Sequence, residues 1–117
     1  MKKYIQLLLV SLVLGGCSVT GPMGTSQNKG PGAVLLAQAE TQQQLGNLSK
    51  SIALVERAVR IEPRNAYAWH HLAKLYFEAE NYKKAEQFAL RSNQFAGQDR
   101  QLVNENSRLI ESIRLKQ

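Results

Sequence analysis

The sequence has little of what metal sites and catalytic sites need. It holds one cysteine, Cys17, and two histidines among 117 residues, so no intrachain disulfide can form and no thiolate metal cluster is expected. The histidines, His70 and His71, are adjacent, and on a helix their side chains point about 100° apart, which prevents a shared metal ion or proton relay. No HExxH, CxxC, GxSxG or phosphate-binding glycine loop is present. We therefore expect no enzyme activity, no metal and no cofactor.

The N-terminus has the layout of a bacterial export signal. Lys2 and Lys3 precede an apolar run over residues 4–14, which is too short for a transmembrane helix of about 20 residues. The following LGGC, ending at Cys17, resembles the lipobox of bacterial lipoproteins. The resemblance implies that residues 1–16 are a signal peptide, that Cys17 carries acyl chains such as palmitate, and that the protein is membrane-anchored. By the same analogy, Ser18 implies the outer membrane, with the protein facing the periplasm.

The excess of positive charge does not indicate a nucleic-acid partner here. Lys and Arg number 15 against 9 Asp and Glu, for a net charge of +6, which in another context would favour DNA or RNA. Removal of the signal peptide takes Lys2 and Lys3 with it, and the remaining basic residues are scattered. An exported chain does not meet nucleic acid, so we expect attraction to acidic protein or envelope surfaces instead.

Residues 17–32 follow as a lipidated cysteine and a flexible linker. Residues 18–32 contain four glycines and two prolines and show no hydrophobic period. The folded domain is therefore predicted to cover residues 33–117.

From residue 33 onward the chain repeats itself at an offset of 34 residues. In the second copy, large residues at i, i+3 and i+7 mark one helix face, and small residues mark the next helix, which lets two helix axes approach closely. We expect helices over residues 33–44, 48–61, 66–79, 82–95 and 99–115, with Asn65 and Asp99 as N-caps. The face residues are Trp69, Leu72, Ala73 and Tyr76, followed by Ala85, Ala89 and Ser92.

A 34-residue period with these residues resembles the tetratricopeptide repeat (TPR). The resemblance implies an all-α fold of two helix-turn-helix repeats, closed by a C-terminal capping helix that places Val103, Ser107 and Ile110 in the register of a third first helix. Two repeats and a cap are close to the lower limit for an independent core, which leaves room for a weak homodimer.

The whole layout resembles the small TPR lipoproteins that activate class A penicillin-binding proteins, the bifunctional peptidoglycan synthases. The resemblance implies a protein–protein interaction module that docks to such a synthase during cell-wall synthesis. An assembly factor for a type IV pilus or secretion component is the alternative, and a glycan-binding module is a third. The residues that extend the likeness beyond the generic repeat are residues 62–65, Trp69, His70, Asn93, Ala96, Gly97, Asp99 and residues 108–110.

The helix expected over residues 66–79 carries a second line of side chains, offset from the predicted core face, which is the candidate binding surface. It consists of Tyr67, His70, Lys74 and Phe77, spaced i, i+3, i+7 and i+10. In the TPR family, these positions of each first helix line the concave groove that binds partner segments. The alternative is that Tyr67 and Phe77 pack against neighbouring helices, whereas Trp69 is assigned to the core. The predicted partner-binding residues are Tyr67, His70, Lys74 and Phe77, together with Arg108 one repeat further on.

The lipobox generates a direct prediction. Replacing Cys17 with Ser removes the thiol that would be acylated, so the Cys17→Ser chain should accumulate as an uncleaved precursor. Mass spectrometry of the chain from a membrane fraction measures this. Normal maturation of the variant would refute lipidation at Cys17.

Overall fold

The computed structural model describes residues 30–117, which form five α-helices and no strand within that range. The helices are α1 (Pro31–Gln44), α2 (Leu48–Ile61), α3 (Ala66–Glu78), α4 (Tyr82–Phe95) and α5 (Arg100–Lys116). The all-α prediction is confirmed, and the expected helix ends differ from the observed ones by two residues or fewer. The predicted signal peptide, Cys17 and most of the predicted linker lie outside the described residues.

The largest difference is at the start of α1, which begins at Pro31 rather than at residue 33. Proline suits the first helical position because its φ angle is already helical and its missing N–H has no helical acceptor there. The Gly32 N–H donates to Glu62 Oε1 at 3.1 Å. A Cβ on Gly32 would lie 2.6 Å from a Glu62 carboxylate oxygen, so the absence of a side chain is what allows this contact.

Local capping chemistry sets the other helix ends. Asn65 accepts from the Ala68 N–H at 3.2 Å, and Asp99 accepts from the Leu102 N–H at 3.0 Å, as predicted. Gly46 and Gly97 follow α1 and α4 with φ angles of +80° and +58°, a backbone conformation that glycine adopts without strain.

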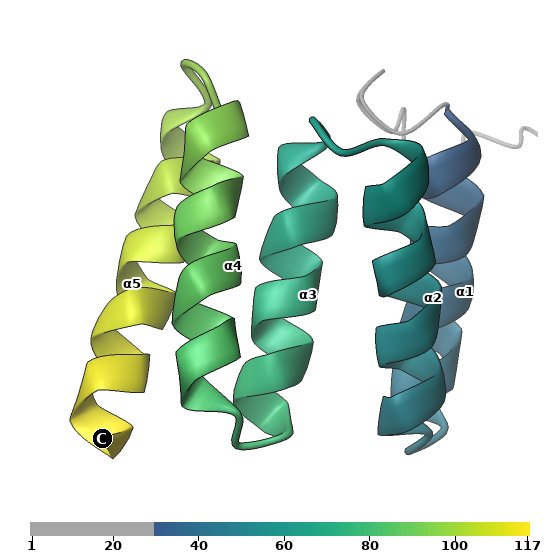
Figure 1. The fold of residues 1–117 in the computed structure, drawn as a ribbon, viewed down its shortest axis with the longest axis horizontal. Helices are drawn as coiled ribbons and strands as arrows, with labels where there is room; N and C mark the ends of the chain where they lie inside the picture. The colour runs from purple at the N-terminus through teal and green to yellow at the C-terminus, as the bar shows by residue number, and fades with distance from the viewer. Residues whose placement is uncertain (1–29) are drawn as a thin grey trace, which may run out of the picture.

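The helices lie side by side in chain order as antiparallel neighbours (Figure 1). The most extensive packing is between α1 and α2 and between α3 and α4, and α5 packs on α4. This is the predicted arrangement of two repeats and a capping helix. The start of α1 lies at the same end as the α2–α3 and α4–α5 connections (Figure 1).

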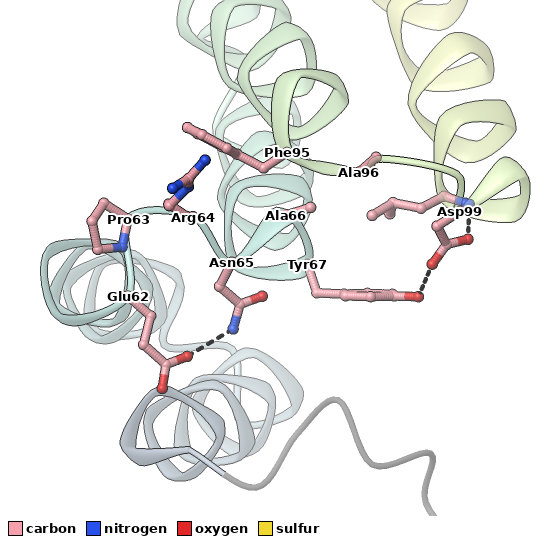
Figure 2. A pocket seen from close by; sticks show the side chains of 10 residues that line it. Glu62, Pro63, Arg64, Asn65, Ala66, Tyr67, Phe95, Ala96 and Asp99 are labelled. Atoms are coloured by element: carbon pink, nitrogen blue, oxygen red, sulfur yellow. Dashed lines mark hydrogen bonds between the residues drawn. The ribbon is translucent and has the colours of Figure 1, made fainter.

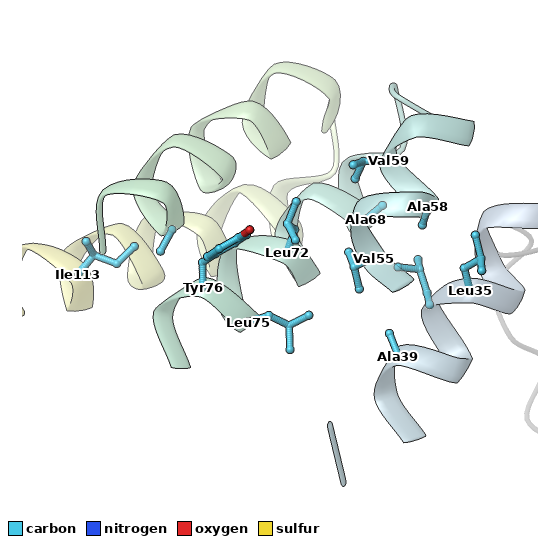
Figure 3. Packing of buried hydrophobic residues seen from close by; sticks show 12 residues of the cluster. Leu35, Ala39, Val55, Ala58, Val59, Ala68, Leu72, Leu75, Tyr76 and Ile113 are labelled. Atoms are coloured by element: carbon cyan, nitrogen blue, oxygen red, sulfur yellow. The ribbon is translucent and has the colours of Figure 1, made fainter. Parts of the chain in front are cut away.

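The core forms where large side chains of one helix meet small ones of the next. Leu72, Leu75 and Tyr76 of α3 are buried in one cluster with the fully buried Ala85 of α4. The fully buried Ala89 of α4 packs in a smaller cluster with Ala73 of α3. Figure 3 shows the larger cluster continuing from α3 to Leu35 and Val55 of the first repeat. Burial of small residues lets the helix axes approach closely.

Trp69 is only half-buried and does not lie inside the core as predicted. Its ring packs at the edge of the α3–α4 pair, 5.6 Å from the Phe88 ring, and Arg91 lies over it at 5.4 Å. Its indole N–H donates to the Pro63 carbonyl at 2.7 Å. Trp69 therefore covers the core and fixes the α2–α3 connection.

The capping helix follows the implied register at Ile110, which is buried, and at Val103, which is partly buried, but departs from it at Ser107. Leu102, Asn106, Ile110 and Ile113 are buried, whereas Ser107 is exposed. Ser107 corresponds to Ala73, which α4 covers, and residues 30–117 contain no sixth helix that could cover Ser107.

The core analysis predicts very different costs for two leucine truncations. Leu75 is fully buried and Leu115 is 82% exposed. Leu75→Ala should lower the free energy of unfolding by about 2–5 kcal/mol, because the cavity it leaves cannot collapse fully. The control Leu115→Ala should stay within about 0.5 kcal/mol of wild type. Urea unfolding of the purified chain measures both, and equal midpoints for the two variants would contradict the core assignment.

Candidate functional site

A groove runs between α1 and α3 on one side of the domain, with a volume of about 540 Å³. We call it the inner groove, because α1 and α3, the first helices of the two repeats, supply all of its lining residues. Three of the five predicted partner-binding residues, Tyr67, His70 and Lys74, line it. Its full lining is Ala33, Leu36, Ala37, Glu40, Gln43 and Gln44 of α1 with Tyr67, His70, His71 and Lys74 of α3.

Tyr67 forms the rim of the inner groove and is 37% exposed. Its hydroxyl donates a hydrogen bond to Asp99 Oδ2. This hydrogen bond to a carboxylate, with a smaller contribution from burial, raises the pKa of Tyr67 to about 12. The ring is therefore held in one position and stays a neutral phenol, so it can contact a ligand with its face.

His70 is tied into a polar network that joins three helices. Its Nδ1 lies 2.7 Å from Asn106 Oδ1, and the Asn106 amide in turn donates to Ser92 Oγ at 2.8 Å and to Asn93 Oδ1 at 2.9 Å. Because Asn106 offers an oxygen, Nδ1 carries the proton of His70. Burial is the main cause that lowers the pKa of His70. Only 12% of the side chain is exposed, so His70 supports the groove wall more than it offers a contact surface.

His71 also lines the groove, and sequence reasoning missed it. It is only 8% exposed, and its Nε2 lies 3.4 Å from Gln43 Oε1. Burial, with smaller effects of Lys74 and His70, lowers the pKa of His71 to about 4. The repeat offset contains a signal for it, since His71 corresponds to Ala37, which lines the same groove from α1.

The inner groove is consequently almost neutral near pH 7. Both histidines are uncharged there, which leaves Lys74 as the cation and Glu40 as the carboxylate among the lining residues. Lys74 is exposed and lies at the α3 side of the groove. An extended protein segment can therefore be recognised by polar contacts and by one charge contact at Lys74.

Phe77 and Arg108 lie outside the inner groove. The Phe77 ring packs edge-on against the Tyr82 ring, with 5.7 Å between centroids, and belongs to the rim of the core cluster. For Phe77 the packing alternative therefore describes the structure, because the start of α4 reaches across it. Arg108 is exposed on α5, beyond the helices that line the groove.

A family model described as the tetratricopeptide repeat matches residues 42–103, more than half of the chain. The chain belongs to the tetratricopeptide-repeat family. A similar solved structure is the globular C-terminal domain of LpoP from P. aeruginosa, with 33% sequence identity and a TM-score of 0.72. The match covers 74% of this chain and 82% of the LpoP domain. No curated protein shows significant sequence similarity to this chain.

These two matches confirm the TPR fold and the resemblance that the sequence indicated. They assign this TPR chain to a family of protein-interaction modules. No helix within residues 30–117 has the length and apolar character needed to span a bilayer.

The burial of His71 predicts a dependence of stability on pH. Its folded-state pKa of about 4 lies below the ordinary 6.5, so between these values the unfolded chain binds a proton that the folded chain does not. The free energy of unfolding should therefore fall as the pH drops from about 6.5 to about 4 and show no further loss from this group below that. Allowing for water in the groove, we expect a loss of about 1–2 kcal/mol.

The His71→Gln variant checks this prediction, because glutamine keeps a polar side chain and does not titrate. Urea unfolding at a series of pH values should give the variant a flatter profile than wild type across that window. A variant profile parallel to the wild-type profile would show that His71 is not the group responsible.

Proposed function

We propose that this chain is an outer-membrane-anchored periplasmic TPR lipoprotein that docks to a class A penicillin-binding protein and activates it. The observation that carries the proposal is the match to the LpoP domain, which combines 33% identity with a TM-score of 0.72 over most of both chains. The sequence resemblance to TPR activators of these synthases points to the same function.

The inner groove is the proposed docking surface. It offers the fixed Tyr67 ring, a polar wall from His70 and His71, and one exposed cation at Lys74. None of these groups forms a nucleophile with an adjacent base, so the proposed role is binding without catalysis by this chain. A protein that binds the active conformation of a synthase more tightly than the inactive one shifts the synthase toward activity.

The proposed anchor constrains how the domain meets its partner. Acylation at Cys17 would leave the 13 residues 18–30 before α1, enough for about 20 Å on average and about 45 Å at full stretch. The domain would then hang from the end at which α1 starts, where the α2–α3 and α4–α5 connections also lie (Figure 1). The partner would have to supply most of the reach across the periplasm.

Charge reversal at Lys74 tests the docking surface. Lys74→Glu should weaken binding to a purified class A penicillin-binding protein about tenfold and reduce the stimulated rate of glycan polymerisation in proportion. Lys74 has no ion pair among the described residues, so its reversal should leave the fold intact. Surface-immobilised synthase and the full-length lipoprotein in detergent provide the binding assay.

Arg57→Glu is the matched control, because Arg57 is an exposed cation on α2, which contributes nothing to the inner groove. It should bind as wild type does. Equal affinities for the two variants would contradict the groove assignment.

His70→Ala is a poor probe of binding, since it would leave the buried Asn106 Oδ1 without its hydrogen-bond partner inside the helix interface. If the wild-type chain binds no synthase and instead captures a pilus or secretion component, the assembly function takes its place.

A further inference from the structure

A second cavity opens at the end of the domain where α1 starts, and we call it the end pocket. Its volume is about 590 Å³. Figure 2 shows its residues gathered from the α2–α3 connection with the start of α3, and from the α4–α5 connection with the adjoining helix ends. The residues that matter here are Pro63, Arg64, Ala66, Tyr67, Phe95 and Leu102.

Hydrogen bonds among the lining residues, and from Trp69 and Gly32 outside the pocket, hold the walls of the end pocket in place. The Pro63 carbonyl accepts from the Trp69 indole at 2.7 Å, and Glu62 accepts from the Asn65 amide at 3.0 Å and from the Gly32 N–H at 3.1 Å. On the opposite wall, Asp99 accepts from the Tyr67 hydroxyl and from the Leu102 N–H (Figure 2). A pocket whose walls are already fixed loses little conformational entropy on binding.

The floor of the end pocket is apolar and separate from the main core. Ala66, Ala96 and Leu102 are buried there, and the partly buried Phe95 packs against them. The two alanines are too small to fill the space above them, which leaves a cavity within the size range that binding pockets have. Such a floor favours an apolar or aromatic side chain over a polar one.

The charged residues that line the end pocket determine which kind of group can lie next to the bound apolar side chain. Glu62 and Asp99 are both engaged in the hydrogen bonds given above, so each carboxylate already has donors. Arg64 is exposed and has no hydrogen bond or ion pair within residues 30–117. A free guanidinium beside an apolar floor is suited to bind a ligand in which a carboxylate lies next to an apolar group.

Tyr67 connects the end pocket with the inner groove, because its ring lines both cavities. A segment lying in the inner groove can therefore pass the Tyr67 rim and place a side chain in the end pocket without leaving the surface. One partner can be held at both cavities, and each cavity supplies one free cation, Lys74 in the groove and Arg64 at the pocket.

We propose that the end pocket is a second anchoring site for the protein partner, which takes an apolar or aromatic side chain with an Asp or Glu next to it. This inference rests on the proposed docking of a protein in the inner groove, and it adds a recognition element outside that groove. Arg64 binds the acidic residue, and the Phe95, Ala66 and Leu102 floor binds the apolar one.

Site-specific crosslinking of the full chain in cells tests the proposal. The photoreactive residue p-benzoylphenylalanine is placed at position 95 in the end pocket, at position 74 in the inner groove, or at position 90. Leu90 of α4 is 49% exposed and lines neither cavity, so it serves as the control. We expect positions 74 and 95 to crosslink to the same protein and position 90 to give no such product. Mass spectrometry should locate the residue captured from position 95 within two positions of an Asp or Glu.

The outcomes separate this inference from the proposed function. Capture of one class A penicillin-binding protein from both positions, with the acidic neighbour present, supports both. Capture of one different protein from both positions, with that neighbour, supports the end pocket and overturns the synthase as partner. Capture from position 74 alone overturns the end pocket and leaves the docking groove. Products from position 95 that contain lipid, glycan, a second copy of this chain or its own residues 18–29 overturn the end pocket, as does the absence of products from both positions.

Charge reversal supplies the second measurement. Arg64→Glu should weaken binding to the captured protein about tenfold, and the difference should shrink as the salt concentration rises, whereas Arg64→Lys should retain most of the affinity. Arg57→Glu is again the control. Binding of Arg64→Glu at the wild-type affinity would show that the end pocket does not recognise an acidic residue.

Discussion

The structure depends on close contact between helices at small, fully buried side chains. Ser51 Oγ donates to the Ala39 carbonyl at 2.8 Å, and Ser92 Oγ donates to the Ala66 carbonyl at 2.8 Å. Each bond links a side chain of the second helix of a repeat to the backbone of its first helix, which is reachable only when the axes lie close together. Larger residues at these positions would separate the helices and remove the contacts that bring α1 and α3 together around the inner groove.

The interface between the second repeat and the capping helix α5 contains a buried network of hydrogen bonds between polar side chains. Asn106 is fully buried and stands at the position that Leu72 occupies one repeat earlier. Its amide is satisfied by Ser92, Asn93 and His70, and no buried side-chain nitrogen or oxygen in the described part of the chain lacks a partner. A buried amide that is satisfied in only one geometry specifies how the cap docks. The same network holds the His70 side chain, of which only 12% is exposed, against α5.

The lining residues of the two cavities carry charges of both signs. Burial keeps the histidines of the inner groove neutral, and hydrogen bonds occupy the carboxylates of the end pocket. Lys74 of the inner groove and Arg64 of the end pocket remain as separate cations. Because Glu40, Glu62 and Asp99 line the same cavities, the two cations do not form the continuous basic surface that a polyanion would need. The Tyr67 ring, held by its hydrogen bond to Asp99, is the kind of fixed aromatic side chain that often concentrates binding energy in protein interfaces.

The sequence alone determined the helices, their caps and the pairing of large with small residues, because these follow from local backbone chemistry and from a period that appears in the order of residues. The caps Asn65 and Asp99 were predicted correctly without any information on distant segments of the chain. The tertiary structure decided which residues of the candidate binding surface are accessible. A helical period assigns a residue to a face, but its burial depends on a helix that comes from elsewhere in the chain, such as α4 over Phe77 and α5 beside His70. The end pocket lay beyond sequence reasoning for the same reason, since residues 62–67 and 95–102 meet only after α3 and α4 have packed.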